Sequence, residues 1–148
     1  MEHALPPEKV LQAEERLTEV RTELYKQFRD EDGYTDFIDR LSERDRAMVL
    51  VSSLYQQVNN GGFCQWDHNG YNDHRVLPAL RDIGPKGTLV AGWIEEMTDQ
   101  GLFEELEEED ELREQEMMDA LHDYDDMFYQ GTGREMLVEL AARYFGQP

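Results

Sequence analysis

Apolar residues recur at intervals of three and four along almost the whole chain, which is the spacing of one face of an α-helix. The clearest run extends from Ala47 through Leu50, Val51 and Leu54 to Val58. It predicts a helix that ends at residues 59–62, Asn-Asn-Gly-Gly, because Asn and Gly best tolerate the left-handed backbone that follows a helix. The alternation that is typical of strands is not found. The sequence therefore predicts an all-α fold.

The same periodicity predicts further helices before and after this one. They cover residues of about 8–30, 34–41, a short turn at 63–70, and then 77–83, 89–97, 117–128 and 137–144. Two starts resemble capping boxes, an imperfect one of Ser42 with Asp45 and one of Thr132 with Glu135. No linker or internal repeat divides the chain, so we expect a single compact domain of about seven helices over residues 1–148, with an N-terminal helix at about 8–30.

The composition indicates in which cellular compartment we expect the protein. The first ten residues contain no apolar run, and no segment approaches the roughly 20 apolar residues that a membrane helix needs. Cys64 is the single cysteine among 148 residues, which excludes an internal disulfide and a zinc site of several cysteines. We therefore expect a cytoplasmic protein that is not bound to a membrane.

The charge is concentrated in one part of the chain. Sixteen carboxylates lie between Glu95 and Asp126 with one cation, Arg113, so this stretch carries −15 of the formal net charge of −20. Such a surface repels nucleic acid and anionic lipid and attracts basic proteins or cations. Direct binding of DNA is disfavoured, because it needs Lys or Arg at the phosphates.

The acidic stretch has two parts. Leu102, Phe103 and Leu106 are apolar anchors, and the run Glu107–Glu111 that follows offers nothing to bury. Beyond it, one helical stripe carries Glu111, Gln115, Asp119, Asp123 and Asp126, opposite the face of Met117, Leu121 and Tyr124. Carboxylates repeated about every 6 Å along a helix can imitate the evenly spaced charges of a DNA strand. Two alternatives to such mimicry are that the acidic stretch is only a solvated face, or that it binds divalent cations non-specifically.

One segment carries a family resemblance. The residues that match a family signature are Asn60, Gly61, Gly62, Phe63, Gln65, Trp66 and Asn69. Two other stretches look like the same family, residues 80–84 (Leu-Arg-Asp-Ile-Gly) and the acidic-aromatic residues 121–129. Over about residues 34–145 the chain resembles the bacterial DNA-mimic-protein family, a domain family of largely unknown function.

The resemblance implies an all-α fold with the signature buried or half-buried near its middle. It also implies a non-enzymatic role, since the family's named member occupies the DNA-binding surface of a transcription factor. Cys64 and Trp66 stand at positions that we expect to vary within the family, and no family motif defines the dense acidic run at residues 104–111.

The sequence gives less support to a ligand pocket, a metal site, a phosphate loop or a reactive cysteine. Asn60, Gln65 and Asn69 could line a ligand pocket, but amides more often cap helices and satisfy backbone groups. The pairs Asp67-His68, Asp73-His74 and His122-Asp123 lack the spacing of a metal site. Residues 30–33 lack the ligand ladder of an EF-hand, and residues 84–88 lack the phosphate loop. Nothing indicates an activated Cys64 thiolate. We predict neither a metal nor a cofactor.

The leading hypothesis is an acidic, non-enzymatic protein that occupies the basic DNA-binding surface of a partner such as a transcription factor. The carboxylates expected to contact the partner are those of Glu104, Glu105, Glu107, Glu108, Glu109, Asp110, Glu111, Glu114, Asp119, Asp123 and Asp126. One alternative is an immunity or inhibitor protein that neutralises a basic nuclease or toxin. Another is an enzyme with a pocket near residues 60–63 that uses Asp67, His68 or Asp73. A homodimer through Trp93, Met97 or Met117-Met118 is also open.

Overall fold

The computed structural model of the chain describes residues 5–27, 33–106 and 110–146. Within these residues there are seven α-helices, one π-helical turn and no strand. The elements are α1 (Pro7–Gln27), α2 (Tyr34–Arg40), α3 (Glu43–His68), α4 (Val76–Ile83), α5 (Pro85–Asp99), α6 (Glu111–Met127), η1 (Phe128–Thr132) and α7 (Gly133–Phe145). The predicted all-α fold is confirmed.

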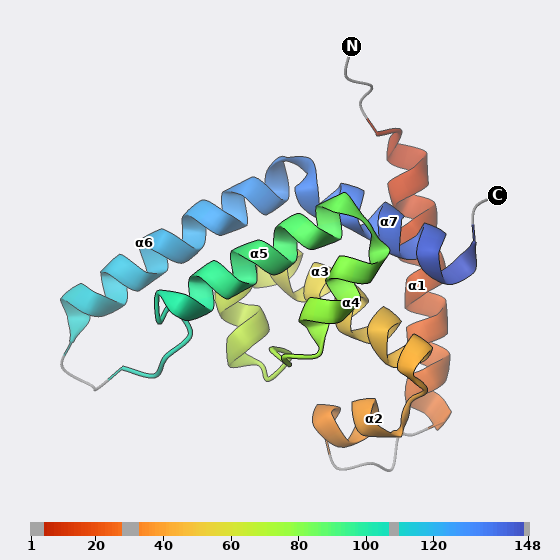
Figure 1. Cartoon of the computed structure of the whole chain (residues 1–148), viewed down its shortest axis with the longest axis horizontal. Helices are drawn as coiled ribbons and strands as arrows, with labels where there is room; N and C mark the ends of the chain where they lie inside the picture. Colours follow the sequence, from red (N-terminus) through yellow and green to blue (C-terminus); the bar gives the residue numbers. More distant parts are fainter. Residues whose placement is uncertain (1–4, 28–32, 107–109, 147–148) are drawn as a thin grey trace.

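Helix α3 is the central element of the fold. Residues 48–55 are buried without interruption, and α1, α2, α4, α6 and α7 all pack against α3. A helix that is covered on every side must be apolar on every side, which explains the run Val49-Leu50-Val51. In Figure 1, α4 and α5 lie over one side of α3, and α1 lies next to the first part of α3. Helix α6 extends away from α1. The beginning of α6 and helix α1 therefore lie at opposite ends of the molecule.

The start of α3 confirms the first predicted cap. The Ser42 hydroxyl accepts a hydrogen bond of 3.1 Å from the Asp45 N–H. We expect Ser42→Ala to lower the free energy of unfolding by about 1 kcal/mol, since one N–H of the first turn loses its acceptor. Urea unfolding followed by circular dichroism measures the change. Ser42→Asp, which keeps an accepting side chain, is the control, and equal losses in the two variants would contradict the assignment.

The second predicted cap, Thr132 with Glu135, is wrong. Thr132 has helical dihedral angles, and its side chain makes no capping hydrogen bond. Instead the π-helical turn η1, which is kinked at Gly131, joins α6 to α7, and the Gly133 N–H donates to the Phe128 carbonyl. Because the backbone itself already pairs this N–H at the start of α7, no side-chain cap is needed there. The local sequence resembles a helix start, but the break in the helical backbone lies one residue earlier, at Gly131, whose φ is 143°.

The predicted end of the central helix is confirmed as a sharp kink. Gly61 and Gly62 have non-helical dihedral angles, and Gly62 has φ 81° and ψ 179°. A side chain is strongly disfavoured in that region of backbone space. Residues 63–68 then form the short helical turn predicted from the sequence, still within α3. The kink leaves backbone groups on both sides without partners in the helix.

Two helix starts are capped by carboxylates from distant helices. The Glu139 carboxylate of α7 accepts hydrogen bonds from the N–H groups of Lys86 (3.1 Å) and Gly87 (2.8 Å) at the start of α5. A Cβ on Gly84 would lie 2.6 Å from Glu139 Oε2, so this glycine makes room for the cap. A negative charge at a helix N-terminus is also favoured by the helix dipole. The second part of α3, after the kink, is likewise capped by a carboxylate from another helix.

Candidate protein-binding surface

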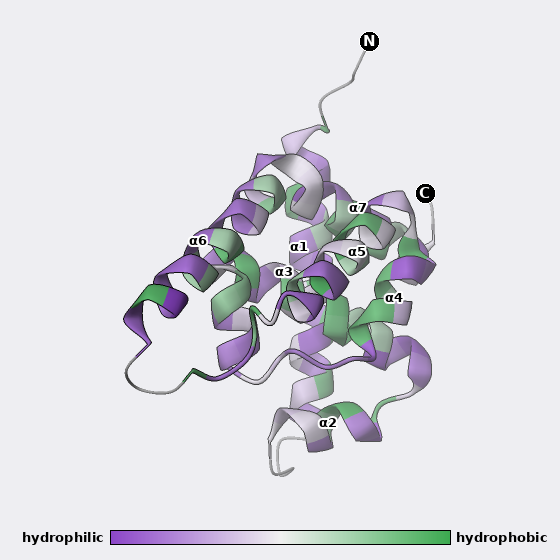
Figure 2. Ribbon diagram, turned by 60° about the vertical axis from the view of Figure 1, so that its left-hand side comes forward, coloured by the Kyte–Doolittle hydropathy of each residue, from purple (hydrophilic) through white to green (hydrophobic). Residues whose placement is uncertain are grey.

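The acidic residues lie on the end of α5, on the described part of the segment that follows it, and on α6. We call this region the acidic surface and define it by its twelve exposed carboxylates. These are Glu95, Glu96, Asp99, Glu104, Glu105, Asp110, Glu111, Glu114, Glu116, Asp119, Asp123 and Asp126. Figure 2 shows α6 as a largely hydrophilic helix along one side of the molecule, with its hydrophobic residues interspersed along it.

Most of the predicted partner-contacting residues lie on this surface. Glu104, Glu105, Asp110, Glu111, Glu114, Asp119, Asp123 and Asp126 are all exposed. Glu107, Glu108 and Glu109 lie outside the described residues. Opposite the stripe, Met117 and Leu121 are buried and Tyr124 is half-buried, so the predicted division of α6 into a core face and a solvent face is confirmed. That these carboxylates contact a partner stays a prediction.

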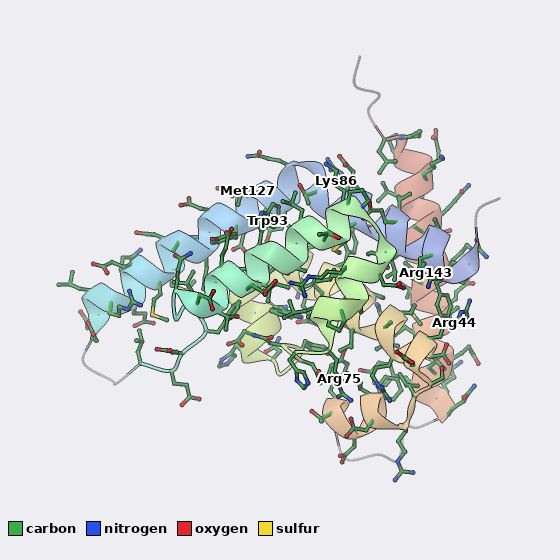
Figure 3. The ribbon with its side chains drawn as sticks, viewed as in Figure 1. Arg44, Arg75, Lys86, Trp93, Met127 and Arg143 are labelled. Carbon is green, nitrogen blue, oxygen red and sulfur yellow. The ribbon has the colours of Figure 1, made fainter. Side chains whose placement is uncertain are left out.

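Few of these carboxylates have a cationic partner. Among the described residues, only Glu95, which pairs with Arg81, and Glu116, which pairs with Arg113 at 3.9 Å, form ion pairs from the acidic surface. Basic side chains elsewhere bind other acids; for example, Arg143 pairs with Asp82 at 2.9 Å. The labelled Arg44, Arg75 and Arg143 lie far from the beginning of α6 (Figure 3). The acidic surface therefore keeps nearly all of its negative charge.

Arg113, the one cation of the stretch, has a structural role. Its guanidinium donates to the Gln100 carbonyl at the end of α5 over 3.3 Å. The Asp110 carboxylate caps α6 by accepting from the Arg113 N–H at 3.1 Å. Glu96 accepts a hydrogen bond of 2.9 Å from the Tyr124 hydroxyl, so α5 and α6 are joined a second time. These contacts hold the two acidic helices in a fixed relation.

The predicted apolar anchors hold the segment between these helices. Leu102 is buried, and Phe103 and Leu106 are half-buried against the core. The Phe103 ring makes an edge contact with Trp66, with 5.9 Å between the ring centroids. Trp66 is fully buried and belongs to the signature segment. The signature therefore supports the acidic surface from beneath.

Two side chains of the α6–η1 region satisfy the backbone at the kink of α3. The Asp125 carboxylate accepts a hydrogen bond of 2.8 Å from the Phe63 N–H, after the kink. The Tyr129 hydroxyl donates to the Val58 carbonyl, before the kink, over 2.6 Å. Residues four apart lie on the same face of a helix, so one face of this region serves both sides of the break. The acidic-aromatic stretch and the glycine kink form one structural unit.

Of the carboxylates in this stretch that the structure describes, Asp125 is the buried one, only 6 % exposed. Burial raises the pKa of its carboxyl, and the hydrogen bond from Phe63 and the nearby His122 oppose that rise. The sequence reasoning did not single it out. The signal was present, because Asp125 lies four residues after Leu121 and eight after Met117, on the core face of α6. A charged residue at a core position indicates a specific buried partner.

Most of the other signature residues are packed or hydrogen-bonded within the fold. Phe63 and Trp66 are fully buried. The side-chain amides of Gln65 and Asn69 both donate to the Gln57 side-chain oxygen, at 3.1 and 3.2 Å, so they tie the two parts of α3 together. Asn60 alone of the three proposed pocket amides lines a cavity, together with Gln57.

The residues considered for catalysis or metal binding have other roles. Hydrogen bonds from Arg75 hold the pKa of Asp73 below its usual value, and Asp67 accepts from the Asn72 side chain at 2.9 Å. His68 is exposed. Burial raises the pKa of the half-buried Cys64 thiol, which works against a reactive thiolate. Within the described ranges, no group of three or more His, Cys, Asp or Glu side chains is placed to hold a metal ion.

The fold and this surface define a compact all-helical protein with a dense acidic face on a rigid scaffold. The chain belongs to the family of DMP19-like proteins, whose sequence pattern matches residues 39–147. The resemblance is thereby confirmed at the level of the family, while the role of the Asn-Gly-Gly-Phe segment as its signature stays an interpretation. No curated protein and no solved structure matches the chain. In the part of the chain that the structure describes, no helix is long and apolar enough to cross a membrane.

Proposed function

We propose that this protein is a non-enzymatic DNA mimic, which places its acidic surface on the DNA-binding surface of another protein and competes there with DNA. The observation that supports this most directly is the state of the acidic surface. Its twelve exposed carboxylates have only two ion-pair partners among the described residues. Arg and Lys side chains that normally contact phosphates would find carboxylates in their place.

The rigidity of the surface supports the proposal further. A solvated charge run needs no fixed geometry, whereas a mimic has to hold its charges in register with the cations of its target. Here α6 is capped by Asp110, joined to α5 through Arg113 and Tyr124, and joined to α3 through Asp125. Helix α6 is thus held against the core, and it presents the exposed stripe of Asp119, Asp123 and Asp126 in a fixed position. Preorganised charges lose less conformational entropy when they bind.

Competition with DNA tests the proposal. The immobilised protein is incubated with lysate of its own organism at low salt, and captured proteins are eluted with a short DNA duplex. We expect elution of a DNA-binding protein by the duplex at an ionic strength at which buffer alone releases nothing. A captured protein that stays bound in the presence of saturating duplex would contradict mimicry. Capture of a nuclease that is inhibited at its active site would instead support the inhibitor alternative.

The affinity for the captured partner is expected to depend steeply on salt. Attraction between exposed charges is screened within about 8 Å at 0.15 M ionic strength, and electrostatic complementarity acts mainly on the association rate. We expect the dissociation constant to rise about tenfold or more between roughly 50 and 200 mM NaCl. Titration calorimetry at four salt concentrations measures it. An affinity that is constant across this range would show that apolar contacts, not charges, hold the complex.

A further inference from the structure

A cavity of about 680 Å³ lies between α1 and the part of α3 before the kink. This volume is within the range of small-molecule sites. Its lining is polar and rich in amides, with Gln56, Gln57, Asn59 and Asn60 from α3. Tyr71 and Leu137 complete it. None of the twelve carboxylates of the acidic surface lines it.

Arg21 of α1 lines this cavity and is only 9 % exposed. Its guanidinium donates to the Ser52 hydroxyl, and no carboxylate pairs with it within the described residues. Burial lowers the pKa of Arg21. The groups that act against this are the hydroxyls of Tyr25, Tyr34 and Tyr71, which carry no charge at neutral pH. Buried charges in folded proteins are normally paired or bind a ligand.

A second buried donor lies near Arg21. The Tyr34 hydroxyl is buried and makes no hydrogen bond of good geometry within the described residues, and the Ser53 hydroxyl is the polar group near it. The Tyr34 ring packs on Tyr71, which lines the cavity, with 4.5 Å between the ring centroids. This side of the cavity therefore carries a buried positive charge, and no carboxylate of the described residues pairs with it.

The opposite end of the cavity carries a negative charge. Glu14 is on the same helix, seven residues before Arg21, which is about 10 Å along the axis. Its carboxylate accepts a hydrogen bond of 2.7 Å from the Tyr55 hydroxyl, and both residues line the cavity. A ligand would thus meet a cation at one end, a carboxylate at the other, and amides between them.

We propose that this cavity binds a small polar molecule through a carboxylate or phosphate group held by Arg21. The planar guanidinium presents a fork of donors that matches either oxyanion, and the amides face the rest of the ligand. A group that donates hydrogen bonds fits the Glu14 end. Helix α1, which supplies Arg21 and Glu14, lies outside residues 39–147, whereas the amides of the cavity lie inside them.

The test compares the wild type with Arg21→Met and with Arg16→Met, an exposed arginine on the same helix. Thermal unfolding is recorded in sodium chloride, inorganic phosphate and sodium acetate at one ionic strength. We expect phosphate or acetate to raise the Tm of the wild type and of Arg16→Met saturably, by about 3–6 °C at ten times the dissociation constant. Arg21→Met should show no such rise. A response to phosphate alone identifies a phosphate ligand, and one to acetate alone a carboxylate ligand.

The proposal is overturned if neither anion acts beyond chloride, or if Arg21→Met responds as the wild type does. If Arg21→Met does not fold, the wild type alone decides the question. In that case, the Arg21 Nε–H signal in ¹⁵N-labelled protein should shift saturably with the active anion while that of Arg16 stays in place. An Arg21 signal that does not move with either anion would equally refute the site.

Discussion

Replacing Gly62 with alanine is expected to lower the free energy of unfolding by about 3–5 kcal/mol. Gly62 has φ 81° and ψ 179°, a combination that is nearly restricted to glycine and costs about 1–3 kcal/mol for other residues. The added Cβ would also lie 2.8 Å from Asp125 Cγ and would displace this carboxylate. The hydrogen bond from the buried Phe63 N–H, worth about 1.5–3 kcal/mol when the acceptor is charged, would then be lost.

Three variants separate these two effects in urea unfolding experiments. Gly70→Ala is the matched control, because Gly70 also has a positive φ, 86°, but a Cβ there would meet nothing within 4 Å. It should lose much less stability than Gly62→Ala. Asp125→Ala removes the acceptor alone. The double variant Gly62→Ala/Asp125→Ala should be clearly less destabilised than the sum of the two single variants. Additive losses would show that Gly62 and Asp125 do not act on the same contact.

Neutralising four carboxylates of α6 is expected to weaken the binding of a partner about a hundredfold. The variant combines Glu114→Gln, Asp119→Asn, Asp123→Asn and Asp126→Asn. All four side chains are exposed, so the fold should be kept. Each substitution removes one attraction to a cation on the partner, and charge pairs at an interface act together on the association rate and the affinity. Surface plasmon resonance against the captured partner measures both.

A control with the same net charge distinguishes location from total charge. Glu15→Gln, Glu19→Gln, Glu23→Gln and Asp36→Asn neutralise four exposed carboxylates on α1 and α2. Both variants change the formal net charge from −20 to −16. If the acidic surface is the contact, the control should bind within about threefold of the wild type. Equal weakening in both variants would mean that only the overall negative charge matters.

The amphipathic pattern was sufficient to predict most of this structure. It gave the helices, the break at Gly61-Gly62 and the exposed stripe of α6, because each depends on residues that are close in sequence. It failed at Thr132, which is helical and lies one residue after the break at Gly131 in the π-helical turn between α6 and α7. Local signals describe which conformations a segment can adopt, and here the backbone pairs the Gly133 N–H with the Phe128 carbonyl, so that no side-chain cap is needed.

The residues that sequence reasoning missed are charged groups on buried helix faces. Arg21 lies four residues after Leu17 and three before Leu24, as Asp125 lies four after Leu121. Their positions could be found from the periodicity, but their partners could not. Phe63 is 62 residues away from Asp125, and Ser52 is 31 away from Arg21. No spacing rule connects positions that only the tertiary fold brings together.

The long-range cap at the kink has a consequence for synthesis of the chain. Asp125 is made 62 residues after Phe63, which corresponds to roughly 3–12 s at 5–20 residues per second. During this interval the second part of α3 has no acceptor for its first N–H, so the nascent signature segment is incomplete. The helix that brings the acceptor also carries half of the twelve carboxylates of the acidic surface. A prematurely terminated chain would therefore lack both the cap and this half, and the whole charged face would be displayed only by molecules whose scaffold is finished.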